Sequence, residues 1–196
     1  MKPLVLKLGG SLAPSARLQP LLALITRAQR PVIIVPGGGL FADAVRTIQR
    51  QLPFPDQTAH LMALLAMEQM ALHIASLHPC TLCCRTVPDF AKALQTGHIP
   101  VWLPYDLQHD DASLPADWTV TSDALAARLA ERLEGSVALI KSCPVPQEAG
   151  LDRLTDLGIV DPLFAPIVRR THLTWGVYGS SDERLLAKRL LIPPGS

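Results

Sequence analysis

The stretch Lys7-Leu8-Gly9-Gly10-Ser11 follows the apolar run Pro3-Leu4-Val5-Leu6 near the start of the chain. An apolar run that two glycines interrupt predicts a buried strand that ends in a turn. Glycines let the backbone approach a ligand closely, and Ser11 can cap a following helix whose free N–H groups favour an anion. Lys7 adds a positive charge at the same place. The stretch therefore predicts a phosphate site.

A second turn of the same kind follows the β-branched run Val32–Val35, where Pro36-Gly37-Gly38-Gly39 precedes a helical pattern from Leu40. Gly-Gly turns after strands are common, so the first turn alone is not specific. Neither turn has the spacing of a Walker A loop or of a dinucleotide-binding loop. Two glycine-rich turns so close together favour two phosphate-bearing groups that face each other.

Length and composition limit the possible classes of protein. A chain of 196 residues with 48% apolar residues predicts one α/β domain over residues 1–196 with a full core. A formal net charge of +1 argues against a nucleic-acid partner, which needs a basic face. No apolar run approaches the roughly 18 residues of a membrane span, and the first residues do not resemble a signal peptide. We expect a cytoplasmic protein with no membrane partner.

The cysteines do not predict a metal site. Cys80, Cys83 and Cys84 contain a C-x-x-C spacing, and Cys143 stands alone. In the strand expected at 81–84, alternation places Cys80 and Cys84 on one face and Cys83 on the other, which is poor geometry for shared ligation. Core packing is therefore favoured over zinc or redox chemistry, and we assign no metal ligands.

Strand and helix patterns alternate along the whole chain, which predicts a mainly parallel sheet covered by helices on both faces. Strands are expected at 3–6, 32–35, 81–84, 99–103, 137–140 and 174–178. Helices are expected at 18–28, from 40, and at 56–77, 89–96, 123–133, 152–157, 162–169 and 182–191, and 105–116 is expected to be a surface loop. Asp56 or Thr58 can cap the helix at 56–77. That helix is apolar almost all round, so it is either buried on several sides or packed against a second subunit.

Two lysines come at the ends of predicted strands, Lys7 and Lys141. Ligands in parallel sheets bind beyond the carboxyl ends of the strands. Phosphoryl transfer needs positive charge around an anionic transition state, so these lysines are the natural pair to hold the transferred group. A solvated lysine beside a strand is the simpler alternative. Asp123 can hold the lysines, engage magnesium, or only complement the dipole of its helix.

Two further polar residues have both a structural and a functional interpretation. Asp161, in Val160-Asp161-Pro162, can cap a helix or belong to the site. His60 opens the long helix and can contact a substrate phosphate, although a lone histidine is more often structural. Trp102, Trp118 and Trp175 are interpreted as core or as pocket wall.

The order of three motifs resembles the amino acid kinase superfamily: Lys7–Ser11, Val35–Gly39 and Thr121–Ala127. The resemblance implies a three-layer αβα sandwich that transfers the γ-phosphate of ATP with magnesium. It also implies a role for each motif. Lys7 stabilises the transferring group, which Gly9 and Gly10 bind through N–H groups. Gly37, Gly38 and Gly39 hold the acceptor, and Asp123 organises the catalytic lysines Lys7 and Lys141.

Shorter stretches are similar to the short kinases linked to methanofuran biosynthesis. These stretches are Trp118–Asp123, Leu139–Ser142, Gly158–Pro162, Ala59-His60 and Met67–Gln69. The similarity implies an (aminomethyl)furanylmethyl phosphate as acceptor, with His60, Thr121 and Ser122 on the substrate side and Ser11, Ser142 and Asp161 on the nucleotide side.

Departures from the larger members leave the function open. Ser142–Pro146 replaces their Asp-Gly loop, and the part that normally builds the adenine pocket is short. A kinase of a carboxylate acceptor such as an amino acid, or a non-catalytic nucleotide-binding regulatory protein, therefore remains an alternative. For all of these, the apolar helix at 56–77 predicts a homodimer or a higher homo-oligomer.

Overall fold

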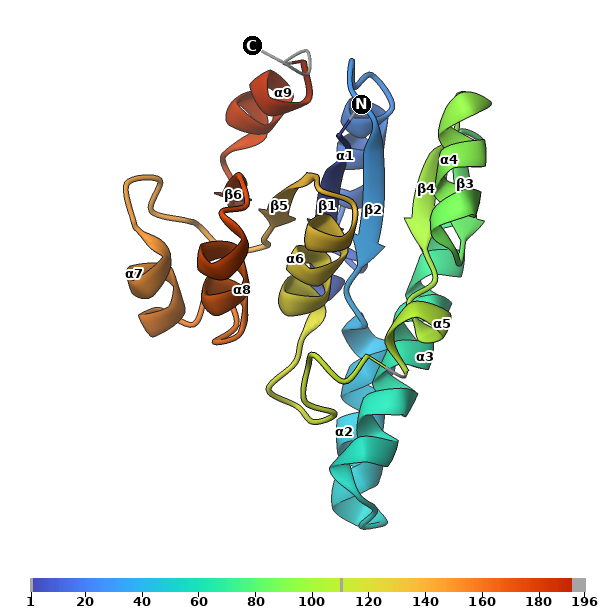
Figure 1. Ribbon diagram of the computed structural model, residues 1–196, viewed down its shortest axis with the longest axis vertical. Helices are drawn as coiled ribbons and strands as arrows, with labels where there is room; N and C mark the ends of the chain where they lie inside the picture. Colours follow the sequence, from blue (N-terminus) through green and yellow to red (C-terminus); the bar gives the residue numbers. More distant parts are fainter. Residues whose placement is uncertain (1, 110, 192–196) are drawn as a thin grey trace.

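The computed structural model describes residues 2–109 and 111–191, and these contain a six-stranded sheet of order β3-β4-β2-β1-β5-β6 (Figure 1). Every neighbouring pair of strands is parallel, which confirms the predicted sheet. The strands are β1 Leu4–Leu8, β2 Val32–Pro36, β3 Thr81–Cys84, β4 Ile99–Trp102, β5 Ser136–Ile140 and β6 Trp175–Tyr178.

Apart from η1 and α5, which the sequence does not predict, the helices lie where they are expected, with ends that differ by a few residues. They are η1 Gly10–Leu12, α1 Leu18–Ile25, α2 Gly39–Gln51, α3 Asp56–Ser76, α4 Val87–Gln95, α5 Tyr105–Gln108, α6 Ser122–Arg132, α7 Leu151–Asp156, α8 Phe164–Thr171 and α9 Glu183–Leu191. Thr121, one of two residues (with Ser122) whose position before the helix suits a cap, caps α6 by accepting the Asp123 N–H.

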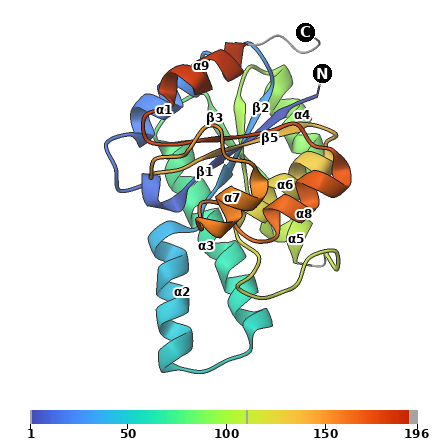
Figure 2. The ribbon, with the colours of Figure 1, turned by 90° about the vertical axis from the view of Figure 1, so that its left-hand side faces the viewer.

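Strand alternation builds a core on each face of the sheet. In β1, Leu4, Leu6 and Leu8 pack in a cluster with residues of α1 and α9. Val5 points to the other face and packs in a cluster with residues of α4, α6 and α8. Figure 2 shows the two groups of helices on opposite sides of the sheet. The predicted three-layer αβα sandwich is therefore confirmed.

The same alternation determines on which face of the sheet Lys7 and Lys141 lie. Val5 and Leu139 belong to the cluster that contains the residues of α6. Lys7 and Lys141 each come two positions further along the chain and so continue the same face. β1 and β5 are neighbouring parallel strands with Lys7 opposite Leu139, so both lysines reach one edge of the sheet, next to the start of α6.

Two predicted helix caps are wrong. Ser11 caps no helix, because Gly10–Leu12 forms a short 3₁₀ turn with Gly9 at its N-cap, and the Ser11 hydroxyl lies 2.8 Å from the Ser142 hydroxyl. Neither Asp56 nor Thr58 caps α3, whose N-cap is Pro55 without a side-chain hydrogen bond. The extended backbone of Pro55 itself starts this helix.

Four apolar residues of α2 have the spacing of a buried face, Leu40, Ala44, Val45 and Ile48, and of these only Val45 is buried. Leu40, Ala44 and Ile48 are exposed, Leu40 by 68%, whereas Ala42 and Val45 are buried. Figure 1 shows the reason: α2 and α3 form a hairpin that extends beyond the sheet, so α2 has α3 as its main neighbour. Only one narrow face of α2 is therefore buried, where the helix packs against α3.

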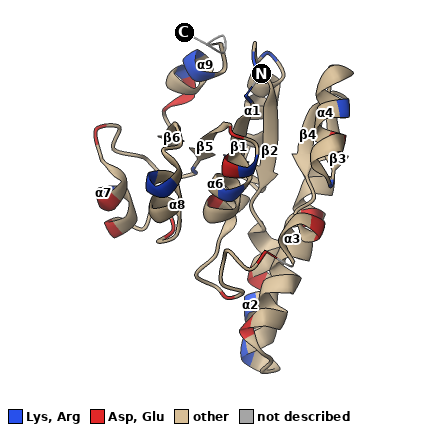
Figure 3. Cartoon of the chain, in the orientation of Figure 1, with Lys and Arg blue, Asp and Glu red and all other residues tan. Residues whose placement is uncertain are grey.

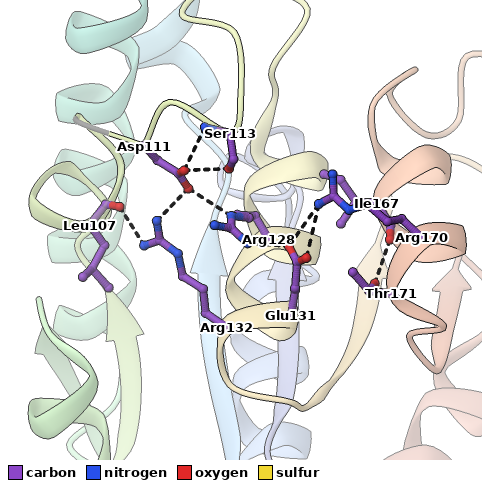
Figure 4. A network of polar contacts seen from close by, with 9 residues as sticks. All are labelled: Leu107, Asp111, Ser113, Arg128, Glu131, Arg132, Ile167, Arg170 and Thr171. Atoms are coloured by element: carbon purple, nitrogen blue, oxygen red, sulfur yellow. Dashed lines mark hydrogen bonds and ion pairs between the residues drawn. The ribbon is translucent and has the colours of Figure 1, made fainter.

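The segment 105–116 is not entirely a surface loop, because it begins with α5 and is then fixed to α6. The Asp111 carboxylate accepts hydrogen bonds from Arg128 Nε at 3.0 Å, Arg132 Nη2 at 2.6 Å and the Ser113 hydroxyl at 2.6 Å (Figure 4). Arg132 also donates to the Leu107 carbonyl. The Asp111 side chain is only 6% exposed, so this network anchors the segment to the sandwich.

Burial opposes the ionised form of Asp111, but the hydrogen bonds from Ser113 and Arg128 and the charge of Arg132 outweigh it and lower the pKa to about 2. A carboxyl with a lowered folded-state pKa stabilises the fold above its ordinary pKa, and this contribution is lost as the pH falls toward 2.

We therefore expect Asp111→Asn to lower the free energy of unfolding by about 2 kcal/mol at pH 7, with a smaller difference at pH 3. Urea unfolding at the two pH values measures this. Asp152→Asn, which removes the exposed ion pair with Arg169, is the control and should cost less than about 1 kcal/mol. Equal effects of the two substitutions would contradict the role given to Asp111.

Candidate active site

A cavity of about 550 Å³ lies at the carboxyl end of β1, β2 and β5. Most of the residues that the sequence predicts for the site line this cavity. They are Lys7, Gly10, Ser11, Gly37, Gly38, Gly39, His60, Thr121, Ser122, Asp123, Lys141 and Asp161. Gly9 and Ser142 do not line it, although Ser142 reaches the site indirectly through Ser11.

A buried cluster of three charges stands at the centre of the cavity wall. Lys7 Nζ lies 2.9 Å from Asp123 Oδ1, and Lys141 Nζ lies 2.5 Å from Asp123 Oδ2. The three side chains come from the end of β1, the residue after β5 and the first turn of α6. One carboxylate thus holds two ammonium groups at the sheet edge.

The electrostatics of this cluster favour an added anion. Burial opposes ionisation of Asp123, but the charges of Lys7 and Lys141 outweigh it and lower the pKa of the carboxyl. Burial, followed by repulsion from Lys7, lowers the pKa of Lys141. Two cations share one anion here, so a phosphoryl group that lies against them would balance the excess positive charge.

Asp161 lies behind the cluster, and its carboxylate is occupied by neighbouring groups. Oδ2 accepts from the Thr121 hydroxyl at 2.7 Å and the Ala124 N–H at 2.9 Å, while Oδ1 accepts from the Leu163 and Phe164 N–H groups. The Asp161 N–H in turn donates to Asp123 Oδ2 at 3.3 Å. Burial raises the pKa of Asp161 in spite of these donors. These contacts join the starts of α6 and α8.

The two glycine-rich turns pack directly against each other. A Cβ on Gly10 would lie 2.3 Å from the Gly39 nitrogen, and a Cβ on Gly37 would lie 2.4 Å from the Gly10 nitrogen. Gly39 also has a φ of 52°, which other residues rarely adopt. These glycines are therefore required by contact between the two turns, before any ligand is considered.

The turns retain free N–H donors only at certain positions. The Gly9 N–H donates to the Ile140 carbonyl and the Gly37 N–H to the Leu8 carbonyl, so neither can bind a ligand. Within residues 2–109 and 111–191, no protein acceptor takes the N–H of Gly10 or of Gly38. Free donors on both turns, together with the lysines, fit bound phosphate groups.

The remaining predicted residues differ in whether their side chains already have hydrogen-bond partners in the protein. The Thr121 hydroxyl already donates to Asp161 and accepts from the Asp123 N–H, so it braces the site. His60 is buried at the start of α3, where burial lowers its pKa in spite of a hydrogen bond to the backbone of Asp117. A neutral imidazole at neutral pH can donate or accept a hydrogen bond from the wall of the cavity.

A second group of polar residues in the cavity is not indicated by the sequence motifs. Asp43 and Arg46 of α2 line it, and the Arg46 guanidinium lies 4.5 Å from the ring centroid of Trp118. Trp118 Nε1 donates to Gln49 Oε1 at 2.7 Å. Trp118, expected in the core or in the pocket wall, lines the cavity. No motif marks Asp43 or Arg46, because they meet Trp118 only in the folded chain.

Magnesium has no dedicated set of protein ligands in this part of the chain. Within the described residues, no group of three or more His, Cys, Asp or Glu side chains is arranged to hold a metal ion. The carboxylates of Asp123 and Asp161 are both engaged. A nucleotide-bound magnesium ion fits this site only if phosphates and water supply most of its ligands, as is usual for this ion.

The described helices include none that is both long and apolar enough to cross a lipid bilayer.

A parallel sheet with two touching glycine turns and a lysine–aspartate–lysine cluster at its carboxyl edge has the features of a phosphotransferase. Residues 2–142 match the amino acid kinase family, and the chain belongs to that family.

Two known kinases are similar to the chain. It is 26% identical over 132 residues to the (5-(aminomethyl)furan-3-yl)methyl phosphate kinase of Methanocaldococcus jannaschii, a match that covers 66% of this chain and 61% of that protein. The crystal structure of uridylate kinase from Archaeoglobus fulgidus aligns with a TM-score of 0.65 at 20% identity, covering 96% of each chain. This second likeness supports the fold.

The contact between the turns makes a prediction about stability. We expect Gly10→Ala to lower the free energy of unfolding by about 3 kcal/mol, because its Cβ would meet backbone atoms of Gly39 that cannot move aside easily. Urea unfolding measures the loss. Gly150→Ala is the control, since nothing lies within 4 Å of its added Cβ, and as a helix N-cap it should cost less than about 1 kcal/mol. Equal losses would show that the turns do not constrain each other.

Proposed function

We propose that the protein is an ATP-dependent small-molecule kinase that transfers the γ-phosphate to a phosphate monoester. The observation that carries the proposal is the Lys7–Asp123–Lys141 cluster beside the free N–H groups of Gly10 and Gly38. Membership of the amino acid kinase family supports ATP as the donor.

The chain's own residues would act mainly by position and charge. Lys7 and Lys141 would hold the transferring phosphoryl group and stabilise the negative charge that develops on its oxygens. Asp123 would hold both ammonium groups in position against the transferring group. The Gly10 and Gly38 N–H groups, one on each turn, would orient the donor and acceptor phosphates toward each other. Bound nucleotide would bring magnesium, which neutralises phosphate charge.

The acceptor that we propose is (5-(aminomethyl)furan-3-yl)methyl phosphate. The similar kinase of Methanocaldococcus jannaschii is named for this compound, and 61% of its length matches. The cavity also suits a small ring with charged arms, because it combines apolar walls from Leu64 and Met67 with the charged side chains of α2.

Phosphorus NMR of the protein with Mg-ATP and a set of acceptors tests the proposal. The set contains the furan phosphate, isopentenyl phosphate, uridylate, glutamate and aspartate. We expect diphosphate signals to grow with the furan phosphate alone. Transfer to glutamate or aspartate would instead identify a carboxylate kinase. ATP binding without transfer to any acceptor would contradict the kinase and favour a regulatory nucleotide-binding protein.

Two lysine variants are the controls for this measurement. Lys7→Ala should lower turnover by at least about a hundredfold, because it removes a charge that stabilises the transition state. Lys92→Ala changes a lysine of α4 that does not line the cavity and should leave turnover unchanged. Near-normal turnover by a folded Lys7→Ala variant would contradict the proposed mechanism.

We also propose a homodimer in which α3 packs against a second copy. Leu65 and Leu72 of α3 are exposed, Leu72 by 60%, although the other apolar residues of the helix are buried or half-buried. They lie two turns apart on one side of the helix, as a self-complementary contact requires. Light scattering should give twice the 21.2 kDa mass of one chain, and Leu72→Glu should give a monomer. Leu157→Glu, at an exposed site after α7, is the control, and a monomeric wild type would contradict the dimer.

A further inference from the structure

The charged residues of α2 form a second polar region of the cavity, separate from the lysine cluster. Asp43 and Arg46 follow Gly39 by about one and two turns, or about 6 Å and 10 Å along the helix axis. Both line the cavity that contains Lys7 and Lys141. Figure 3 shows residues of both charges along α2, beyond the edge of the sheet. An acceptor whose phosphate group is held at the glycine turn would extend its other end toward these residues of α2.

Arg46 is fixed in place by its neighbours. Its guanidinium lies over the Trp118 ring, and its Nη1 donates to Asp43 Oδ1 at 2.9 Å. Trp118 is itself held by the hydrogen bond to Gln49. Arg46 thus has a cation–π contact on one side and a carboxylate on another, and its charge is largely balanced.

Among the described residues that line the cavity, three carry a carboxylate: Asp43, Asp123 and Asp161. The Asp123 carboxylate holds both lysines, and the Asp161 carboxylate accepts from a hydroxyl and three N–H groups. Asp43 differs, because Arg46 occupies only its Oδ1 and its side chain is 64% exposed. Oδ2 of Asp43 accepts no hydrogen bond from the described residues.

We propose that Asp43 is a specificity residue that binds an ammonium group at the far end of the acceptor. A carboxylate with an unused oxygen forms a charge-assisted hydrogen bond with an amine. The carboxylates of Asp123 and Asp161 cannot form such a hydrogen bond without losing their present partners. This inference rests on the proposed function, since the proposed acceptor carries an aminomethyl group opposite its phosphate arm.

The test compares two acceptors in steady-state kinetics: (5-(aminomethyl)furan-3-yl)methyl phosphate and its analogue with a methyl group in place of the aminomethyl group. Wild type should favour the amine by about tenfold in kcat/KM, the size expected of one exposed charge-assisted hydrogen bond. Asp43→Asn should abolish this preference through a higher KM for the amine. The kcat values and the constants for the methyl analogue should change by less than about twofold.

Asp152→Asn is the matched control, because Asp152 is also an exposed helical aspartate paired with an arginine but does not line the cavity. It should keep the preference of wild type. If Asp43→Asn keeps the preference, or weakens both acceptors equally, Asp43 does not recognise the amine and the inference is overturned. If wild type transfers phosphate to neither furan compound but to another acceptor, the proposed acceptor is overturned instead, and the role of Asp43 with it.

Discussion

The site depends on one buried carboxylate held between two lysines. Asp123 joins the end of β1, the residue after β5 and the start of α6, which are distant in sequence. Breaking a buried ion pair typically costs about 3–5 kcal/mol, because the remaining charge has no partner. The cluster therefore holds the sheet edge together while it positions the two cations. Asp161 extends this to α8 through its N–H bond to Asp123.

The glycine turns add a second constraint, which concerns the backbone alone. Gly10 and Gly39 touch through main-chain atoms, so no side chain fits between the turns. This contact brings the free N–H groups of Gly10 and Gly38 to the same cavity as the lysines. Close packing of the two turns and close approach of a ligand therefore both require glycine at these positions. A glycine motif in the sequence cannot by itself distinguish the two causes.

The parts of the structure that follow from local rules were predictable. Strand alternation and the shared carboxyl edge of parallel strands were enough to bring Lys7 and Lys141 together. The face of α2 was not predictable, because it depends on a hairpin with α3 that leaves the sheet. Serine commonly caps helices, so the sequence predicts that role for Ser11, whereas Gly10–Leu12 forms a 3₁₀ turn with Gly9 at its N-cap.

The proposed function divides the cavity between the sheet edge, whose charged residues the sequence motifs indicate, and the charged residues of α2, which they do not. At the sheet edge, Asp123 is paired with Lys7 and Lys141, and all three residues lie in or directly after a predicted strand or helix start. On α2, Asp43 and Arg46 depend on Trp118, which comes from a segment more than seventy residues later. Residues so far apart in the sequence do not form a motif with a recognisable spacing. If Asp43 binds the far end of the acceptor as proposed, a substitution on α2 changes acceptor preference without touching the lysine cluster.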